Sequence, residues 1–131
     1  MIETPLRSFL ASSSLSTSLY ALTSGRVYIG GLPQNATYPA VVMFTISRVD
    51  GHNWDIPEDR IQFSCYADDY SNALALTDAI STMLKRFYQT LPTSTAYTIR
   101  HSVADNRAYL YDDNVLKHVS ILDMLIQYRS I

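Results

Sequence analysis

The side chains that could do chemistry are few and scattered. They are three histidines, one cysteine and one adjacent pair of carboxylates, namely His52, His101, His118, Cys65 and Asp68-Asp69. Zinc sites usually hold their ligands at short, regular spacings, such as i and i+4 on a helix, and the three histidines lack such a spacing. Two carboxylates at the start of a predicted helix ordinarily cap it and interact with its dipole. We therefore expect neither a metal centre nor an acid–base pair.

Motifs of common enzymes are also missing. Gly30-Gly31 lacks the third glycine and the following helix of a dinucleotide-binding turn, and no serine lies in a Gly-x-Ser-x-Gly sequence. Cys65 falls on the apolar side of a predicted strand, which favours a small core residue over a nucleophile. The sequence thus predicts a protein that is not an enzyme and has no cofactor. A small cytosolic enzyme or ligand-binding module stays open as the alternative, because a Ser, His and Asp triad assembled by the fold has no fixed sequence order.

The composition is that of one globular domain. The chain has 131 residues, of which 47% are hydrophobic and 17% charged, so we expect residues 1–131 to form a single domain. The net charge of -2, with no basic run longer than Lys85-Arg86, argues against nucleic-acid binding. Neither a signal peptide nor a run of about eighteen apolar residues is visible, so we expect no membrane span and a protein made and kept in the cytosol.

The elements that position these side chains are clearest between Asp59 and Tyr88. Residues Arg60–Ala67 alternate between apolar and polar, which predicts a strand with one buried face. Apolar residues then recur at helical spacing, which predicts a helix from Ser71 to Tyr88, capped by Asp68-Asp69 and with Lys85-Arg86 in its last turn. The apolar positions are Ile61, Phe63, Cys65 and Ala67 in the strand, and Ala73, Leu76, Ile80, Met83, Leu84 and Phe87 in the helix. The helix should lie on the sheet face that carries Phe63.

The N-terminal third is predicted to form two short helices and a strand. Thr4 is the expected cap of the first helix, with Pro5 as its first residue. Ser16 is the expected cap of the second, and Gly25 its terminator. Their apolar residues are Leu6, Phe9 and Leu10 in the first helix, and Leu15, Leu19 and Leu22 in the second. A brief strand should follow at Arg26–Ile29.

Further strands are predicted on both sides of the long helix. Ala40–Val49 should pair antiparallel with the strand that begins at Arg60. Tyr97–Val103 and Arg107–Tyr111 should form a hairpin around a turn at Asp105-Asn106, and a second turn is expected at Asp112–Asn114. The apolar run Val115–Tyr128 favours a strand, with a helix as the open alternative. The predicted fold is α+β: an antiparallel sheet of four or more strands, with the long helix and the short N-terminal helix packed on one face.

The connection from Asp50 to Glu58 is the expected partner contact. It is longer than a tight hairpin needs and contains the single tryptophan, Trp54, in a polar setting, so we expect a protruding, mobile loop. The predicted interface residues are Asp50, His52, Asn53, Trp54, Asp55 and Glu58. In the alternative, Trp54 folds back over an edge of the core. The ten tyrosines suit half-buried strands or a contact surface, and we favour contacts.

The order and the amino-acid sequence of several segments resemble those of the tail-completion proteins of long-tailed bacteriophages, which are also called tail terminators or tail-to-head joining proteins. The matching stretches are Gly25-Arg-Val-Tyr28, Gly31-Leu-Pro33, Tyr38-Pro-Ala-Val-Val42, Arg60-Ile-Gln-Phe63, Tyr66-Ala-Asp-Asp-Tyr70 and Ala73-Leu-Ala-Leu-Thr-Asp-Ala79. The resemblance covers most of the chain through Phe87 and weakens beyond it, where the Tyr111-Asp112 turn and the last apolar segment fit only in outline.

This resemblance implies a structural role without catalysis. It implies a homohexameric ring that caps the finished tail tube, stops its polymerisation and joins the tail to the head. The implied partners are further copies of the chain, the major tail tube protein and a head-completion or connector protein, with the DNA path inside the ring. The implied location is the neck of the virion, after assembly in the host cytoplasm. Another neck or minor tail component of such a particle stays open as an alternative.

Overall fold

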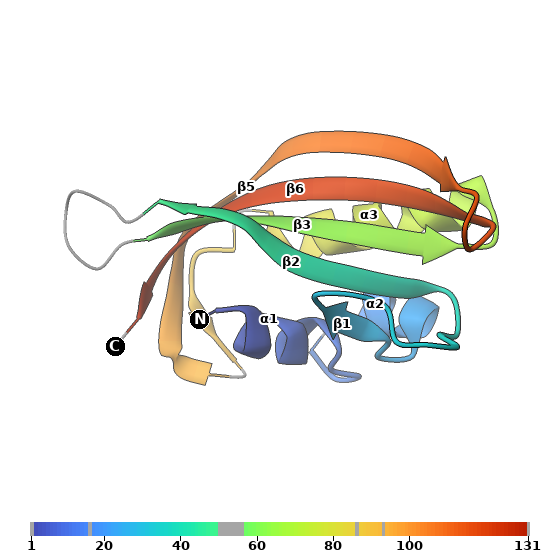
Figure 1. The fold of residues 1–131 in the computed structure, drawn as a ribbon. Helices are drawn as coiled ribbons and strands as arrows, with labels where there is room; N and C mark the ends of the chain where they lie inside the picture. Colours follow the sequence, from blue (N-terminus) through green and yellow to red (C-terminus); the bar gives the residue numbers. More distant parts are fainter. Residues whose placement is uncertain (1, 16, 50–56, 86, 93, 131) are drawn as a thin grey trace.

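The structure is a computed structural model that describes residues 2–15, 17–49, 57–85, 87–92 and 94–130. In these ranges the chain forms three helices and six strands (Figure 1). The helices are α1 (Glu3–Leu10), α2 (Thr17–Thr23) and α3 (Tyr70–Leu84). The strands are β1 (Val27–Ile29), β2 (Ala40–Val49), β3 (Glu58–Ala67), β4 (Thr90–Leu91), β5 (Ser94–Asp112) and β6 (Lys117–Ser130). The fold is therefore α+β, as predicted.

The six strands form one sheet in the order β1-β2-β3-β6-β5-β4. The predicted antiparallel pairing of β2 with β3 is confirmed, with Met43 opposite Phe63. The expectation of a purely antiparallel sheet is wrong, because β1 pairs parallel to β2, with Val27 opposite Val41. Residues 30–39 return the chain to the start of β2, where the Arg26 Nε donates a hydrogen bond to the Pro39 carbonyl at 2.9 Å. This hydrogen bond helps to hold the connection between β1 and β2, because two parallel strands need a connection that runs back from the end of one to the start of the next.

The strand β5 is a single long strand where the sequence predicted a hairpin. It pairs with β6 from Tyr97 to Asp112 without a turn at Asp105-Asn106. The register shifts between Ile99 and His101 and again between Ala104 and Asn106, and Figure 1 shows the strand bending over the sheet. The predicted turn residues lie at the second register shift. Such a β-bulge accommodates an extra residue in one strand, so the strand continues where a turn was expected. The strand alternative for the C-terminal run is confirmed by β6.

The core lies between the sheet and the helices. Buried apolar residues of α1, α2 and α3 form one cluster with those of the sheet, including Ile61, Phe63 and Cys65 as predicted. The helix α3 contacts β3 and β6, whereas α1 contacts β1 and β2. The packing of both helices on one face of the sheet stays a prediction. Leu15 is exposed and does not join the predicted apolar set of the second helix.

The helix ends differ from the predictions in two places. Asp69 caps α3 as expected, because its carboxylate accepts a hydrogen bond from the Asn72 backbone N–H at 2.8 Å. The helix ends at Leu84, and Lys85 has an extended backbone, so this lysine is not in the last turn. The helix α1 begins at Glu3, after Ile2, rather than at the predicted Thr4 cap. The expected Ser16 cap lies outside the described residues.

Candidate functional site

The predicted interface residues are mostly outside the described part of the chain. Asp50, His52, Asn53, Trp54 and Asp55 are among the residues that the structure does not describe, so this interface stays a prediction. The sixth residue, Glu58, is described: it is the first residue of β3 and pairs with Val49 and Gln127, and its role in an interface stays a prediction. Its backbone belongs to the sheet and not to the loop, since the hairpin ladder extends further than the polar sequence indicated.

A buried carboxylate ties three strands together next to this connection. The Asp59 side chain is fully buried on β3. One of its oxygens accepts from the Arg48 Nε at 2.7 Å, and the other accepts from the Arg48 Nη2 at 3.0 Å and from the Tyr128 hydroxyl at 3.1 Å. Burial, with the Asp59 charge second, raises the pKa of Tyr128. The cluster therefore fixes β2, β3 and β6 where the connection between β2 and β3 begins.

The opposite end of the sheet carries a cluster of aromatic side chains that we call the tyrosine end: the exposed Tyr70, Tyr109 and Tyr111 and the half-buried His118. The rings of Tyr70 and Tyr109 meet edge to face at 4.5 Å between centroids. His118 contacts the rings of Tyr109 and Tyr111, and its Nδ1 forms a hydrogen bond with the Tyr109 hydroxyl. Exposed tyrosines held in a cluster offer a rigid, amphipathic contact area, and tyrosine is enriched at protein–protein interfaces for this reason.

The turn between β5 and β6 extends the tyrosine end with an acidic and apolar tip. The Asp112 carboxylate accepts from the Asn114 backbone N–H at 2.9 Å, as expected of the predicted turn. Asp113 is exposed, and Leu116 is 67% exposed with a φ of +57°. Leucine rarely adopts this left-handed conformation, which costs about 1–3 kcal/mol. The tip therefore holds an apolar side chain in water at a strained backbone position.

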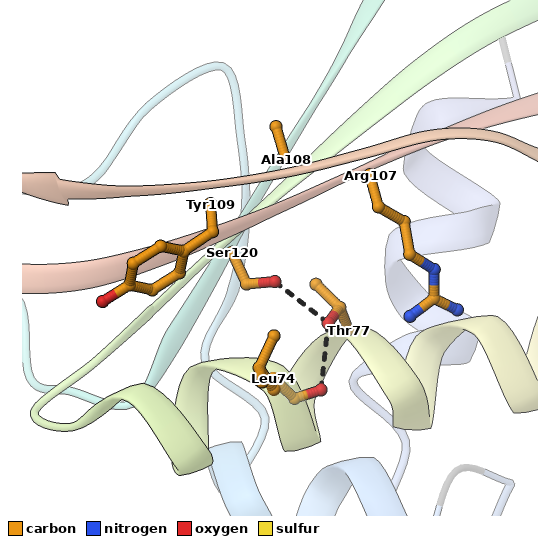
Figure 2. Close-up of a pocket in the computed structure, with 6 residues that line it drawn as sticks. All are labelled: Leu74, Thr77, Arg107, Ala108, Tyr109 and Ser120. Carbon is orange, nitrogen blue, oxygen red and sulfur yellow. Dashed lines mark hydrogen bonds between the residues drawn. The ribbon is translucent and has the colours of Figure 1, made fainter.

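Two cavities that share Arg107 lie between α3 and β5, and we call them together the α3–β5 groove. Its first cavity, of about 230 Å³, is the one drawn in Figure 2. The Thr77 hydroxyl on its floor donates to the Leu74 carbonyl at 2.9 Å, so the Ser120 hydroxyl at 3.1 Å must donate to Thr77. Arg107 forms one wall and reaches across the groove to Asp78 at 2.9 Å. The polar groups of this floor are thus paired.

The second cavity of the α3–β5 groove, of about 380 Å³, has unpaired polar groups. Ser81, Lys85 and Tyr88 line it from the helix side, and Ser102, Val103, Ala104 and Arg107 from β5. Ser102 is fully buried, and its hydroxyl has no hydrogen-bond partner among the described residues. Lys85 is exposed and forms no ion pair within the described ranges. Tyr88 stacks on His101, with ring centroids 6.1 Å apart, and closes one side.

Of the residues considered for catalysis or metal binding, His52 lies outside the described ranges, and those that the structure describes are not brought together. Cys65 is buried, and desolvation raises the pKa of its thiol, so it is held in the unreactive protonated form. His101 and His118 lie apart, at Tyr88 and at the tyrosine end. Within the described ranges, no three His, Cys, Asp or Glu side chains are grouped so that they could hold a metal ion. The helices described here include none that is long and apolar enough to cross a membrane.

Sequence reasoning missed both the tyrosine end and the α3–β5 groove as sites. The only signal was the high tyrosine content, which favoured contacts but did not say which tyrosines meet. Tyr70, Tyr109 and His118 come from three elements, so their proximity depends on the pairing of β5 with β6 and on the position of α3.

Comparisons with known proteins give a likeness of fold. The sequence matches no family model, and no curated protein is significantly similar to it. Among solved structures, the fold is similar to that of a chain in a structure described as the virion of a native gene transfer agent (GTA) particle. The TM-score is 0.70 at 15% sequence identity, and the match covers 92% of this chain and 94% of the other. At this identity the likeness shows a shared fold alone.

Proposed function

We propose that this chain is a structural protein of a tailed-phage virion that forms a ring on the end of the tail tube, ends tail polymerisation and joins the tail to the head. The observation that carries the proposal is the shared fold with a chain of a virion, which extends over nearly the whole of both chains. The sequence resemblance to tail-completion proteins points to the same kind of particle and supplies the position within it. The described residues add no catalytic constellation, so the proposal includes no enzymatic activity.

The proposed partners are further copies of the chain in a homohexameric ring, the tail tube protein and a head connector protein. Exposed tyrosines at one end of the sheet and an open groove along α3 offer separate contact surfaces, as a ring subunit with several neighbours requires. The proposed location is the head–tail junction. A small enzyme would instead be expected to place perturbed ionisable groups in a deep pocket.

The test is removal of the gene from the particle that encodes it, with the protein supplied in trans as the control. We expect tails of uncontrolled length, or tails that fail to join heads, in electron micrographs. A particle map would then place the subunit. Particles with normal tails, or a subunit mapped to the capsid or the distal tail tip, would refute the proposed role, and the map would distinguish another neck component.

The stretch from Asp50 to Glu58 is proposed as a contact with the tube or the connector, with Trp54 as its anchor and with Asp55 and Glu58 near its polar rim. Trp54→Ala should leave the melting temperature of the isolated subunit nearly unchanged and impair tail capping. Trp54→Phe, which keeps an aromatic ring, is the matched control and should retain most of the capping. An unfolded Trp54→Ala variant, or one that caps tails normally, would contradict the contact.

A further inference from the structure

The tyrosine end and the second cavity of the α3–β5 groove lie at opposite ends of α3. Tyr70, which contacts Tyr109, begins the helix, and Lys85 follows its last residue. A helix of 15 residues is about 22 Å long. The tip of the β5–β6 turn therefore cannot reach the cavity of its own chain, although it can reach the cavity of a second chain.

The two surfaces are complementary in charge. The tip exposes Asp113 beside Asp112 at the turn, and Asp69 caps the nearby start of α3. Its one cation, Lys117, is already bound to Asp68, and this hydrogen bond raises the pKa of the ammonium. The cavity at the other end offers Lys85, which has no ion-pair partner among the described residues. An acidic tip thus faces a basic cavity when two copies are placed head to tail.

The two surfaces also match in size and polarity. Leu116 projects from the turn with two thirds of its surface exposed, and the cavity has apolar walls from Val103, Ala104 and the ring of Tyr88. Its 380 Å³ is ample for a leucine side chain, since a cavity of about 150 Å³ accepts benzene. Ser102 lies at the wall of the cavity, and its buried hydroxyl lacks a hydrogen-bond partner within the described ranges.

We propose that Leu116 of one copy enters the second cavity of the α3–β5 groove of another copy, with the Asp113 carboxylate beside Lys85. The proposal rests on the proposed function in taking the partner to be a second copy. The contact is heterologous, so each copy offers one tip and one cavity, and repeated contacts produce a closed ring or an open filament.

A tip in a cavity fits this part of the molecule better than strand addition. From His101 onwards the outer edge of β5 has no paired strand among the described residues. This edge is interrupted by two register shifts, and charged residues such as Arg107 and Asp112 lie along it. Bulges and charges are the features that discourage edge-to-edge pairing. A side-chain contact in the α3–β5 groove does not require pairing along this edge, so neither the register shifts nor the charges oppose it.

Charge exchange tests the proposed contact on the full chain. Sedimentation velocity over a concentration series at low ionic strength would compare the wild-type chain with Lys85→Glu and Asp113→Lys. Each variant should self-associate about fivefold more weakly than the wild type, as expected for an exposed ion pair at the upper end of its range. An equimolar mixture of the two variants should associate as the wild type does, because every tip then finds a cavity of opposite charge.

The variant Leu116→Gly separates contact from folding. Glycine accepts a φ of +57° without strain, so the variant should melt no lower than the wild type while its self-association falls at least tenfold. Leu15→Gly is the matched control, because Leu15 is also an exposed leucine and belongs neither to the β5–β6 turn nor to the lining of the cavity. It should leave self-association unchanged.

The outcomes separate this contact from the proposed function. Self-association of all three variants that equals that of the wild type refutes the contact. A mixture of the two charge variants that associates as weakly as each variant alone refutes it too. A wild-type chain that is monomeric at every concentration also refutes it. None of these results bears on the position of the subunit in the particle, which the gene removal and the particle map decide separately.

Discussion

Replacing Asp59 by Asn should destabilise the subunit strongly, because the change removes a buried charge that holds three groups. The Asp59 side chain is fully buried, and it accepts two hydrogen bonds from Arg48 and one from Tyr128. Breaking a buried ion pair by removing one partner costs about 3–5 kcal/mol. The Arg48 side chain is 33% exposed and can regain some water, so we expect the lower end of this range, about 3 kcal/mol.

Urea unfolding followed by circular dichroism, at one low protein concentration, measures this loss. For a chain of this length, 3 kcal/mol lowers the melting temperature by about 10 °C. Asp78→Asn is the matched control, because Asp78 pairs with Arg107 at the surface, and it should cost less than about 1 kcal/mol. A free energy of unfolding for Asp59→Asn within 1 kcal/mol of the control would show that the Asp59 cluster does not stabilise the sheet.

Three other changes test the core, the helix cap and the response to pH. Ile80→Ala should lower the free energy of unfolding in urea by about 2–5 kcal/mol, because Ile80 is fully buried. Phe87→Ala should lower it by less, because Phe87 is only half-buried. Equal losses in the two variants, or negligible ones, would contradict the packing. Asp69→Ala should cost about 1 kcal/mol by loss of the cap of α3, whereas Asp69→Ser should keep most of the stability. Burial raises the pKa of Cys65 and Tyr128 in the folded chain. The free energy of unfolding should therefore be unchanged below pH 9 and fall above it, because the unfolded chain releases the thiol proton while the folded chain keeps it. Above pH 10 the unfolded chain also releases the phenol proton, which lowers the stability further. Cys65→Ala and Tyr128→Phe should each flatten this alkaline loss, measured as the free energy of unfolding against pH, and an unchanged slope in both would contradict it.

The strand–helix unit in the middle of the chain could be predicted from the sequence alone. The alternation of Ile61, Phe63 and Cys65 places these side chains in the core, and the helical spacing that follows gives α3 with Asp69 as its cap. Gly25 was identified as the end of α2, and it has the positive φ of +83° that such a position favours. These features depend on residues within about one turn or a few strand positions of one another, so the local sequence contains the information that they require.

The tertiary structure decided what depends on distant partners. Asp105-Asn106 has the composition of a turn, but pairing with β6 continues on both sides of it and the Asp105 carboxylate binds Arg60, so the strand bends and does not reverse. The parallel pairing of β1 and the position of Glu58 in β3 were decided in the same way, by the strands beside them. The tyrosine end and the α3–β5 groove exist only once the helix and the long hairpin have been placed, because no segment of sequence contains the residues of either surface. Periodicity within a segment fixes which side chains it buries, whereas the choice of a neighbour depends on contacts between segments tens of residues apart.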